Sequence, residues 1–181
     1  LGGRTEITSG FRNQDLSVFT RMADIEPDWA GLRSLVNTAL TMSIAGYSFI
    51  IPACFKTESS TSTKPTEELY IRWVQAVSLM PSLSFARLGW DYSANGVKLI
   101  KKFVQLHHEH SDTIVELAKR RIRDGVPIIR PMWYLAPDDP KTYAIADQFM
   151  LGEEILVAPI LAKGQLERTV YLPAGVWLDL N

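Results

Sequence analysis

Asp24 is the residue whose type and position best fit acid–base chemistry. It follows a short apolar run, Leu16 to Phe19, and it precedes a segment with the pattern of a helix. Barrel folds present catalytic groups at this junction, where a strand ends and the next helix begins. The alternative is that Asp24 or Asp28 caps the helix by accepting a backbone N–H. Position alone favours capping, so the chemical role needs further support.

Tryptophans are the second group with a chemical use, because an indole face complements the axial C–H surface of a sugar ring. Most tryptophans nevertheless belong to a core. Trp29 is the preferred candidate for sugar contact because it lies near Asp24 in the sequence. The other candidates for sugar contact are Trp73, Trp90 and Trp133.

Histidine and cysteine chemistry has weaker support. His107, His108 and His110 lie together around Glu109, and two histidines three residues apart could share a metal. A second ligand motif is missing, which favours a solvated or partly buried helix face. Cys54 is the single cysteine, so the chain has no internal disulfide and no cysteine-based zinc cluster. We therefore expect neither a metal nor a cofactor.

Charge and hydropathy exclude several partners. The 19 Lys and Arg residues nearly cancel the 20 Asp and Glu residues, so no long-range field attracts nucleic acid or an anionic membrane. The sequence has no run of eighteen apolar residues, and phosphate-cradling glycine motifs are also missing. A neutral substrate fits this balance. Both ends of the sequence read as cut from a longer protein, and the compartment stays open.

The elements that would position these residues alternate between strands and helices. Three-and-four spacing of apolar residues predicts an amphipathic helix that begins near Pro27 and buries one face. Ser93 is expected to cap a long helix that ends at Gly125. Alternation of this kind predicts an α/β fold with a parallel sheet covered by helices. The expected helices are 29–40, 66–80 and 93–125, the strands 43–51 and 126–130, and the exposed loop 56–64.

The pattern changes near residue 150. Short apolar runs at residues 155–157 and 169–172 are separated by glycines and prolines, which is typical of antiparallel strands. We expect a separate β module, with a boundary between residues 150 and 160.

Four ordered motifs resemble glycoside hydrolase family 31, a family of retaining α-glycosidases. They are ELYIRWVQA at 68–76, PIIRPMW at 127–133, DQFMLG with LVAP at 147–159, and VYLPAGVW at 170–177. The similarity extends from about Thr8 to Trp177. The stretch from Arg21 to Asp24, followed by Trp29, is similar to one branch of the family.

The resemblance implies both a fold and a reaction. Residues 1–150 would be the carboxyl-side portion of a (β/α)8 TIM barrel, and residues 151–181 the beginning of an antiparallel β-sandwich. The reaction would be hydrolysis of terminal α-linked glycosidic bonds by two carboxyl groups about 5 to 5.5 Å apart. The partner would be a carbohydrate, an α-glucoside or α-galactoside, with no nucleic acid and no membrane contact within this segment. A parent protein in the secretory pathway, or anchored in a membrane, is compatible with the resemblance.

The resemblance also assigns site residues. In the family an Asp followed five residues later by Trp is the general acid/base, which matches Asp24 and Trp29. Asp24 would protonate the leaving oxygen and then activate water. Trp29 and Arg21 would bind the substrate. The nucleophile lies on an earlier strand in the family, and no residue of this sequence matches it.

Departures from the family pattern keep a second interpretation open. Thr8 stands where the family usually has a substrate-binding arginine, and Ala53 where it commonly has an aspartate. The Arg-Asn-His stretch of the family is replaced at residues 84–87. A lost hydrogen bond to a charged group costs about 1.5 to 3 kcal/mol. The alternative is a catalytically impaired relative that binds a glycan or a protein partner, and a purely structural module is a third hypothesis.

Overall fold

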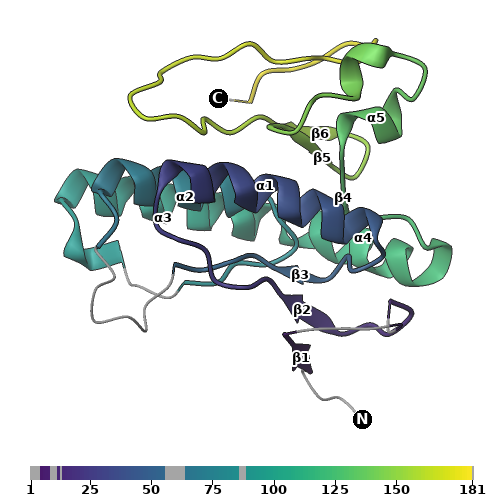
Figure 1. Cartoon of the computed structure of the whole chain (residues 1–181), viewed down its shortest axis with the longest axis horizontal. Coiled ribbons are helices and arrows are strands. Elements are labelled where there is room, and N and C mark those ends of the chain that lie inside the picture. The colour runs from purple at the N-terminus through teal and green to yellow at the C-terminus, as the bar shows by residue number, and fades with distance from the viewer. Residues whose placement is uncertain (1–4, 9–11, 13, 56–63, 86–88, 181) are drawn as a thin grey trace.

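The computed structural model describes residues 5–8, 12, 14–55, 64–85 and 89–180. Figure 1 shows a layer of helices lying between short parallel strands on one side and the C-terminal segment on the other. The fold is mixed α/β, as expected. In chain order the elements are β1 (Glu6–Ile7), β2 (Phe19–Arg21), α1 (Trp29–Ile44), β3 (Ile50–Ile51), α2 (Glu67–Val77), η1 (Gly89–Asp91), α3 (Ala94–Glu109), α4 (Ser111–Asp124), β4 (Ile129–Arg130), α5 (Met132–Leu135), η2 (Pro140–Thr142), β5 (Phe149–Leu151) and β6 (Ile155–Val157).

The first three strands form a parallel sheet, which is the type of sheet that was expected, in the order β1-β2-β3. Thr20 of β2 pairs with Ile7 on one side and Ile50 on the other. Thr20 and Ile50 are buried, whereas the neighbours Phe19 and Arg21 are more exposed. Because successive strand residues point to opposite faces, Phe19 and Arg21 lie on the face away from Thr20.

The strand predicted over 43–51 is wrong in extent. Ser43 and Ile44 form the last turn of α1, and strand pairing is limited to Ile50–Ile51. A dense apolar run suits a buried helix end as well as a strand, so its composition does not separate the two. The buried Ser43 hydroxyl donates to the Ile129 carbonyl at 2.7 Å, which ties the end of α1 to β4.

The single helix predicted over 93–125 is also wrong, because two helices occupy this stretch. His110 leaves helical geometry at φ −98° and ψ 8°, and its Nδ1 contacts the Leu106 carbonyl at 3.0 Å. Both ends of the stretch are as expected. The Ser93 hydroxyl accepts from the Gly96 N–H at 3.1 Å, and Gly125 ends α4 in the left-handed conformation at φ 76°.

The second sheet is antiparallel, in the order β4-β5-β6. The antiparallel pairing predicted after residue 149 is confirmed for β5 and β6. Two other expectations are wrong. Strand β4 pairs with β5 and not with the parallel sheet, and residues 169–172 form no strand. The Tyr171 N–H and carbonyl instead bond to the side-chain amide of Gln148, at 3.0 and 2.8 Å.

The segment after β6 docks on the helical layer through backbone atoms. Glu68 of α2 accepts from the Gly164 N–H at 2.6 Å, and Arg72 donates to the Gln165 carbonyl at 3.0 Å. Arg72 also donates to the Gln75 side chain at 3.0 Å, so its guanidinium is hydrogen bonded on both sides. Within the described ranges, no helix is both long and apolar enough to cross a membrane.

Candidate active site at the ends of the parallel strands

Asp24 lies just beyond β2, and backbone hydrogen bonds on both sides of it join this segment to β3 and the residues that follow β3. The Met22 N–H donates to the Ile51 carbonyl at 3.0 Å, and the Ile25 N–H donates to the Cys54 carbonyl at 3.1 Å. Ile25 and Phe55 form a parallel bridge. The Asp24 side chain is exposed at this carboxyl edge of the sheet, which is the edge where parallel sheets in barrel folds carry catalytic groups.

Asp28 is the residue that caps α1. Its Oδ1 accepts from the Gly31 N–H at 2.6 Å, and its backbone is extended, as an N-cap requires. Capping therefore explains Asp28 and does not explain Asp24. The two carboxylates, which the sequence could not tell apart, have different surroundings.

The turn between Asp24 and Trp29 is packed closely on the helix that follows. A Cβ atom on Gly31 would lie 2.2 Å from the Glu26 carbonyl oxygen and 2.8 Å from a methyl group of Ile25. Only glycine allows this approach. Trp29, the first residue of α1, is partly buried and packs against the core.

Arg21 is anchored by side chains from two other segments. Its Nε and Nη2 donate to the carboxylate of Glu6 on β1, with 3.2 Å between Nη2 and Oε2. Its Nη1 donates to the Ser84 hydroxyl at 3.1 Å, and that oxygen also accepts from the Cys54 thiol at 3.3 Å. The hydrogen bond to Glu6 raises the pKa of the Arg21 guanidinium and lowers the pKa of the Glu6 carboxyl. The charge of Asp24 also raises the pKa of Arg21.

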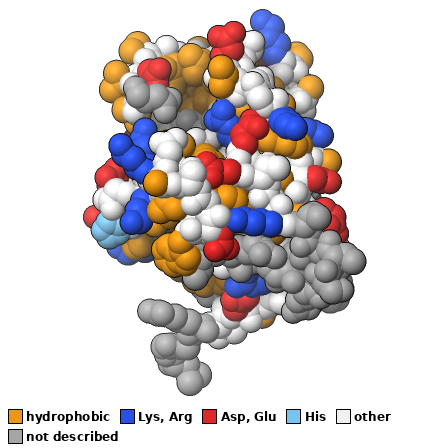
Figure 2. Space-filling view, turned by 90° about the vertical axis from the view of Figure 1, so that its left-hand side faces the viewer, with side chains coloured by type: hydrophobic (Ala, Val, Ile, Leu, Met, Phe, Trp, Pro, Cys, Tyr) orange, Lys and Arg blue, Asp and Glu red, His pale blue; other side chains and the backbone are white. Residues whose placement is uncertain are grey.

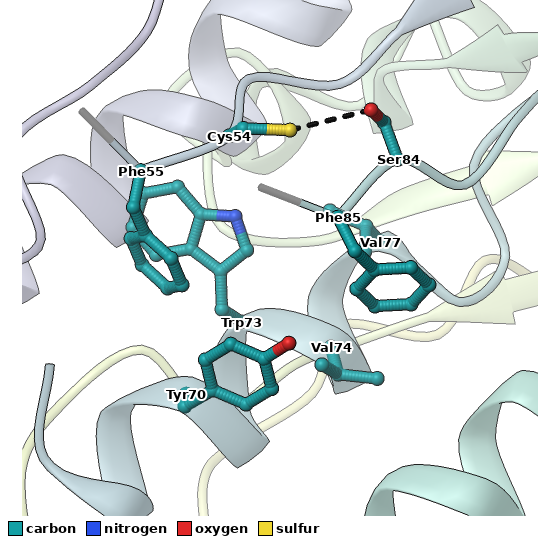
Figure 3. A pocket seen from close by; sticks show the side chains of 8 residues that line it. All are labelled: Cys54, Phe55, Tyr70, Trp73, Val74, Val77, Ser84 and Phe85. Atoms are coloured by element: carbon teal, nitrogen blue, oxygen red, sulfur yellow. Dashed lines mark hydrogen bonds between the residues drawn. The ribbon is translucent and has the colours of Figure 1, made fainter. Parts of the chain in front are cut away.

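A small apolar cavity adjoins this cluster (Figure 3). Its lining includes Cys54 and Ser84 together with the aromatic rings of Phe55, Tyr70 and Trp73. Its volume of about 10 Å³ has room for one water molecule at most. Burial raises the pKa of Tyr70 to about 12. As formed here, the cavity does not hold a sugar ring.

The other tryptophans have different environments. Trp73 is only 4% exposed and donates its indole N–H to the Ala53 carbonyl at 3.2 Å, so it is a core residue. Trp90 is 67% exposed and lines a groove of about 460 Å³ with Tyr70, Phe85 and side chains of α3. Trp133 is 38% exposed on α5. Among the described residues, the lining of the Trp90 groove does not include Asp24.

The histidines make local contacts. His107 Nδ1 contacts the Ser78 carbonyl at 2.9 Å, and His110 contacts its own helix. In the part of the chain that the structure describes, no group of three or more His, Cys, Asp or Glu side chains is arranged to hold a metal. Figure 2 shows basic and acidic side chains interspersed among the described residues of the face in view, in line with the near-zero net charge.

Glu6 and Ser84 are the residues of this cluster that sequence reasoning missed. Glu6 lies fifteen residues before Arg21, and only the pairing of β1 with β2 brings the two together. The single signal in the sequence was an acidic residue beside Ile7 at the start of the chain. Thr8, which departs from the family pattern, directly follows β1. If the register of β1 and β2 is continued by one residue, Thr8 lies level with Arg21.

Comparison with known proteins gives consistent matches. Residues 125–181 match the glycosyl hydrolase family 31 C-terminal domain. The chain is 37% identical to the myogenesis-regulating glycosidase of Mus musculus over 95% of this chain and 26% of that protein. It is 33% identical to the SITS-binding protein of Tetronarce californica over 100% of this chain and 27% of that protein. The chain thus spans about a quarter of the length of these relatives.

Solved structures share the fold. The cycloalternan-degrading enzyme from Trueperella pyogenes superposes with a TM-score of 0.83 over 94% of this chain and 26% of that chain, at 23% identity. A family 31 α-xylosidase from a soil metagenome, solved in complex with xylose, gives a TM-score of 0.75 at 25% identity, over 86% of this chain and 27% of that chain.

Proposed function

The chain belongs to glycosyl hydrolase family 31, and from this premise we propose that it supplies the general acid/base, Asp24, of a retaining α-glycosidase. The observation that carries the proposal is the exposed Asp24 carboxylate at the carboxyl end of β2. The helix behind it is capped by Asp28, so Asp24 is not needed for capping.

The architecture proposed for the complete protein follows from the same membership. Residues 1–150 form the carboxyl-side part of the (β/α)8 barrel, and residues 151–181 begin the β-sandwich. Support for the barrel comes from β1, β2 and β3, which are parallel and adjacent in chain order, with α1 connecting β2 to β3. Support for a separate C-terminal module comes from the change to antiparallel pairing at β5 and β6.

Asp24 performs two proton transfers in this reaction. It first donates a proton to the leaving glycosidic oxygen while a second carboxylate attacks the anomeric carbon. It then removes a proton from the water that hydrolyses the glycosyl intermediate. The attacking carboxylate comes from the part of the protein outside this chain.

Arg21 and Trp29 bind the sugar in this proposal. The family pattern has an arginine at the position of Thr8. Arg21 lies level with Thr8 on the neighbouring strand and so supplies a cation at the same edge of the sheet. A guanidinium has five N–H donors, so Arg21 keeps two beyond its contacts with Glu6 and Ser84. Trp29 offers an indole face whose position is fixed by packing on the core.

The stereochemistry of the product tests the proposal. The complete protein is incubated with 4-nitrophenyl α-glucoside and α-galactoside, and the first sugar released is followed by proton NMR. The α-anomer as first product supports a retaining mechanism, whereas the β-anomer contradicts it.

Binding without hydrolysis is the second candidate function. It is motivated by Ala53, which is buried and has no side-chain acceptor, and whose backbone carbonyl already accepts from the Trp73 indole. The relative named SITS-binding protein also has a name that describes binding. Saturable binding of a disaccharide by calorimetry, with no sugar released after prolonged incubation, would favour this candidate.

A further inference from the structure

The Arg21 guanidinium is held from two sides by residues of other segments. The Glu6 carboxylate accepts from Nε and Nη2, so its two oxygens face one edge of the Arg21 guanidinium. Ser84 accepts from Nη1 at 3.1 Å. Each of the three nitrogen atoms thus has one contact, and the plane of the group is fixed.

We propose that Glu6 and Ser84 are positioning residues that hold Arg21 beside Asp24, with its remaining N–H groups directed at a hydroxyl of the bound sugar. The inference rests on the proposed function, because it takes this strand edge as the sugar site. Glu6 and Ser84 act through Arg21 and need not touch the substrate themselves.

The sheet geometry puts Arg21 on the face where such a contact can form. Thr20 is buried and Arg21 lies on the opposite face, as does Phe19. The Phe19 ring packs edge-on against Phe49, with 6.1 Å between the ring centres. Asp24 follows Arg21 by three residues, and its charge adds to the rise in the pKa of the guanidinium that the hydrogen bond to Glu6 causes.

Fixing the guanidinium in advance strengthens sugar binding. A long arginine side chain loses rotamer freedom when it binds a ligand. An ion pair that already orders the side chain lowers that cost and improves affinity. If Glu6 only joined β1 to β2, its loss would lower stability without changing the affinity for the sugar.

The test compares kinetic constants and melting temperature for variants of the complete protein on an α-glycoside. Glu6→Gln keeps the shape of the side chain but loses its charge, so KM should rise about tenfold while kcat changes less than twofold. Ser84→Ala removes one contact and should raise KM about threefold, which keeps the test usable if Glu6→Gln folds poorly. Glu154→Gln removes an exposed acidic charge elsewhere and should leave both constants unchanged.

A double-mutant cycle separates positioning from simple strand pairing. Because Glu6 acts through Arg21, Glu6→Gln combined with Arg21→Met should raise KM no more than Arg21→Met alone. An active wild type whose KM is unchanged by both Glu6→Gln and Ser84→Ala would overturn this inference and leave the proposed function intact. The inference would also be overturned if the KM increases of Glu6→Gln and Arg21→Met multiplied in the double variant. A wild type that neither hydrolyses nor binds α-glycosides would overturn both proposals.

Discussion

The Asp28 carboxylate accepts a 2.6 Å hydrogen bond from the Gly31 N–H. This contact assigns the cap of α1 to Asp28 and fixes the turn that carries Asp24. The close packing of Gly31 on the Glu26 carbonyl belongs to the same arrangement. The position of the proposed acid/base therefore depends on a glycine in the following helix.

Gly31→Ala should lower the stability of the protein and loosen the turn that carries Asp24. The added methyl group would lie 2.2 Å from the Glu26 oxygen, so the turn has to move. Overpacking of this kind costs about 1 to 3 kcal/mol, partly offset by the better helix propensity of alanine. Urea unfolding should show a lower midpoint, and hydrogen exchange should become faster in residues 24–31.

Thr41→Ala on the same helix is the matched control. Its side chain is exposed and, among the described residues, its one hydrogen bond is to the Asn37 carbonyl one turn earlier, so the unfolding midpoint should stay nearly constant. Equal midpoints for Gly31→Ala and Thr41→Ala would show that the turn adapts to a side chain.

Gln148→Leu should release the C-terminal segment. Gln148 is buried, and its amide bonds to both the N–H and the carbonyl of Tyr171. Leucine fills similar space but leaves both groups unpaired, at a cost of about 2 kcal/mol. Hydrogen exchange by mass spectrometry should become faster in residues 165–175, whereas α1 should keep its protection.

Gln148→Glu gives a graded comparison. A carboxylate still accepts from the Tyr171 N–H but no longer donates to its carbonyl. At pH 7 the two oxygens then face each other, so this segment should exchange at least as fast as in Gln148→Leu. Protection equal to that of the wild type would contradict the assigned role of the amide.

Glu153→Gln should reduce stability at neutral pH and have little effect in acid. Hydrogen bonds from Arg130 and then Arg120 lower the pKa of Glu153 below its usual 4.5. A lowered carboxyl pKa stabilises the fold at pH values above the unfolded pKa, and this contribution is lost as pH falls through the folded pKa. Arg130 is only 3% exposed, so at pH 7 the variant leaves a buried cation with a weaker partner.

Urea midpoints measured at pH 7 and near pH 3 check this dependence. Because Glu153 is half exposed, the loss at pH 7 should be about 1 kcal/mol, shrinking toward zero in acid. Glu154→Gln, one residue further and exposed, should show no such change with pH. A constant difference between Glu153→Gln and the wild type would exclude the ion pair as its cause.

Local signals predicted much of the helical layer. The spacing from Trp29 to Leu40 identified the buried face of α1, and the helix starts expected at residues 66 and 93 agree with α2 and α3, which Thr66 and Ser93 cap. Predictions that depended on partners were less accurate. The apolar run at 43–51 divides between a helix end and a strand, and residues 169–172 bond to Gln148 where a strand was expected.

The candidate site was only partly visible in the sequence. Asp24 and Asp28 both precede a helix, and only the contact with Gly31 separates the cap from the exposed carboxylate. The bond between Arg21 and Glu6 forms across two paired strands, so no spacing rule along the chain would find it. Asp24, Arg21 and Trp29 as site residues remain predictions.

The measurement that tests the central claim most directly compares Asp24→Asn with Asp28→Asn in the complete protein. Both changes replace a carboxylate by an amide within the same turn, but asparagine at position 28 still caps the helix. Rates are measured on a nitrophenyl α-glycoside and on a disaccharide, whose leaving oxygen needs stronger protonation. We predict that Asp24→Asn slows disaccharide hydrolysis by about 10²-fold to 10⁴-fold. Hydrolysis of the nitrophenyl substrate should slow less, and Asp28→Asn should hydrolyse both substrates at the wild-type rate. Equal rates for Asp24→Asn and the wild type on the disaccharide would contradict the role of Asp24 as acid/base.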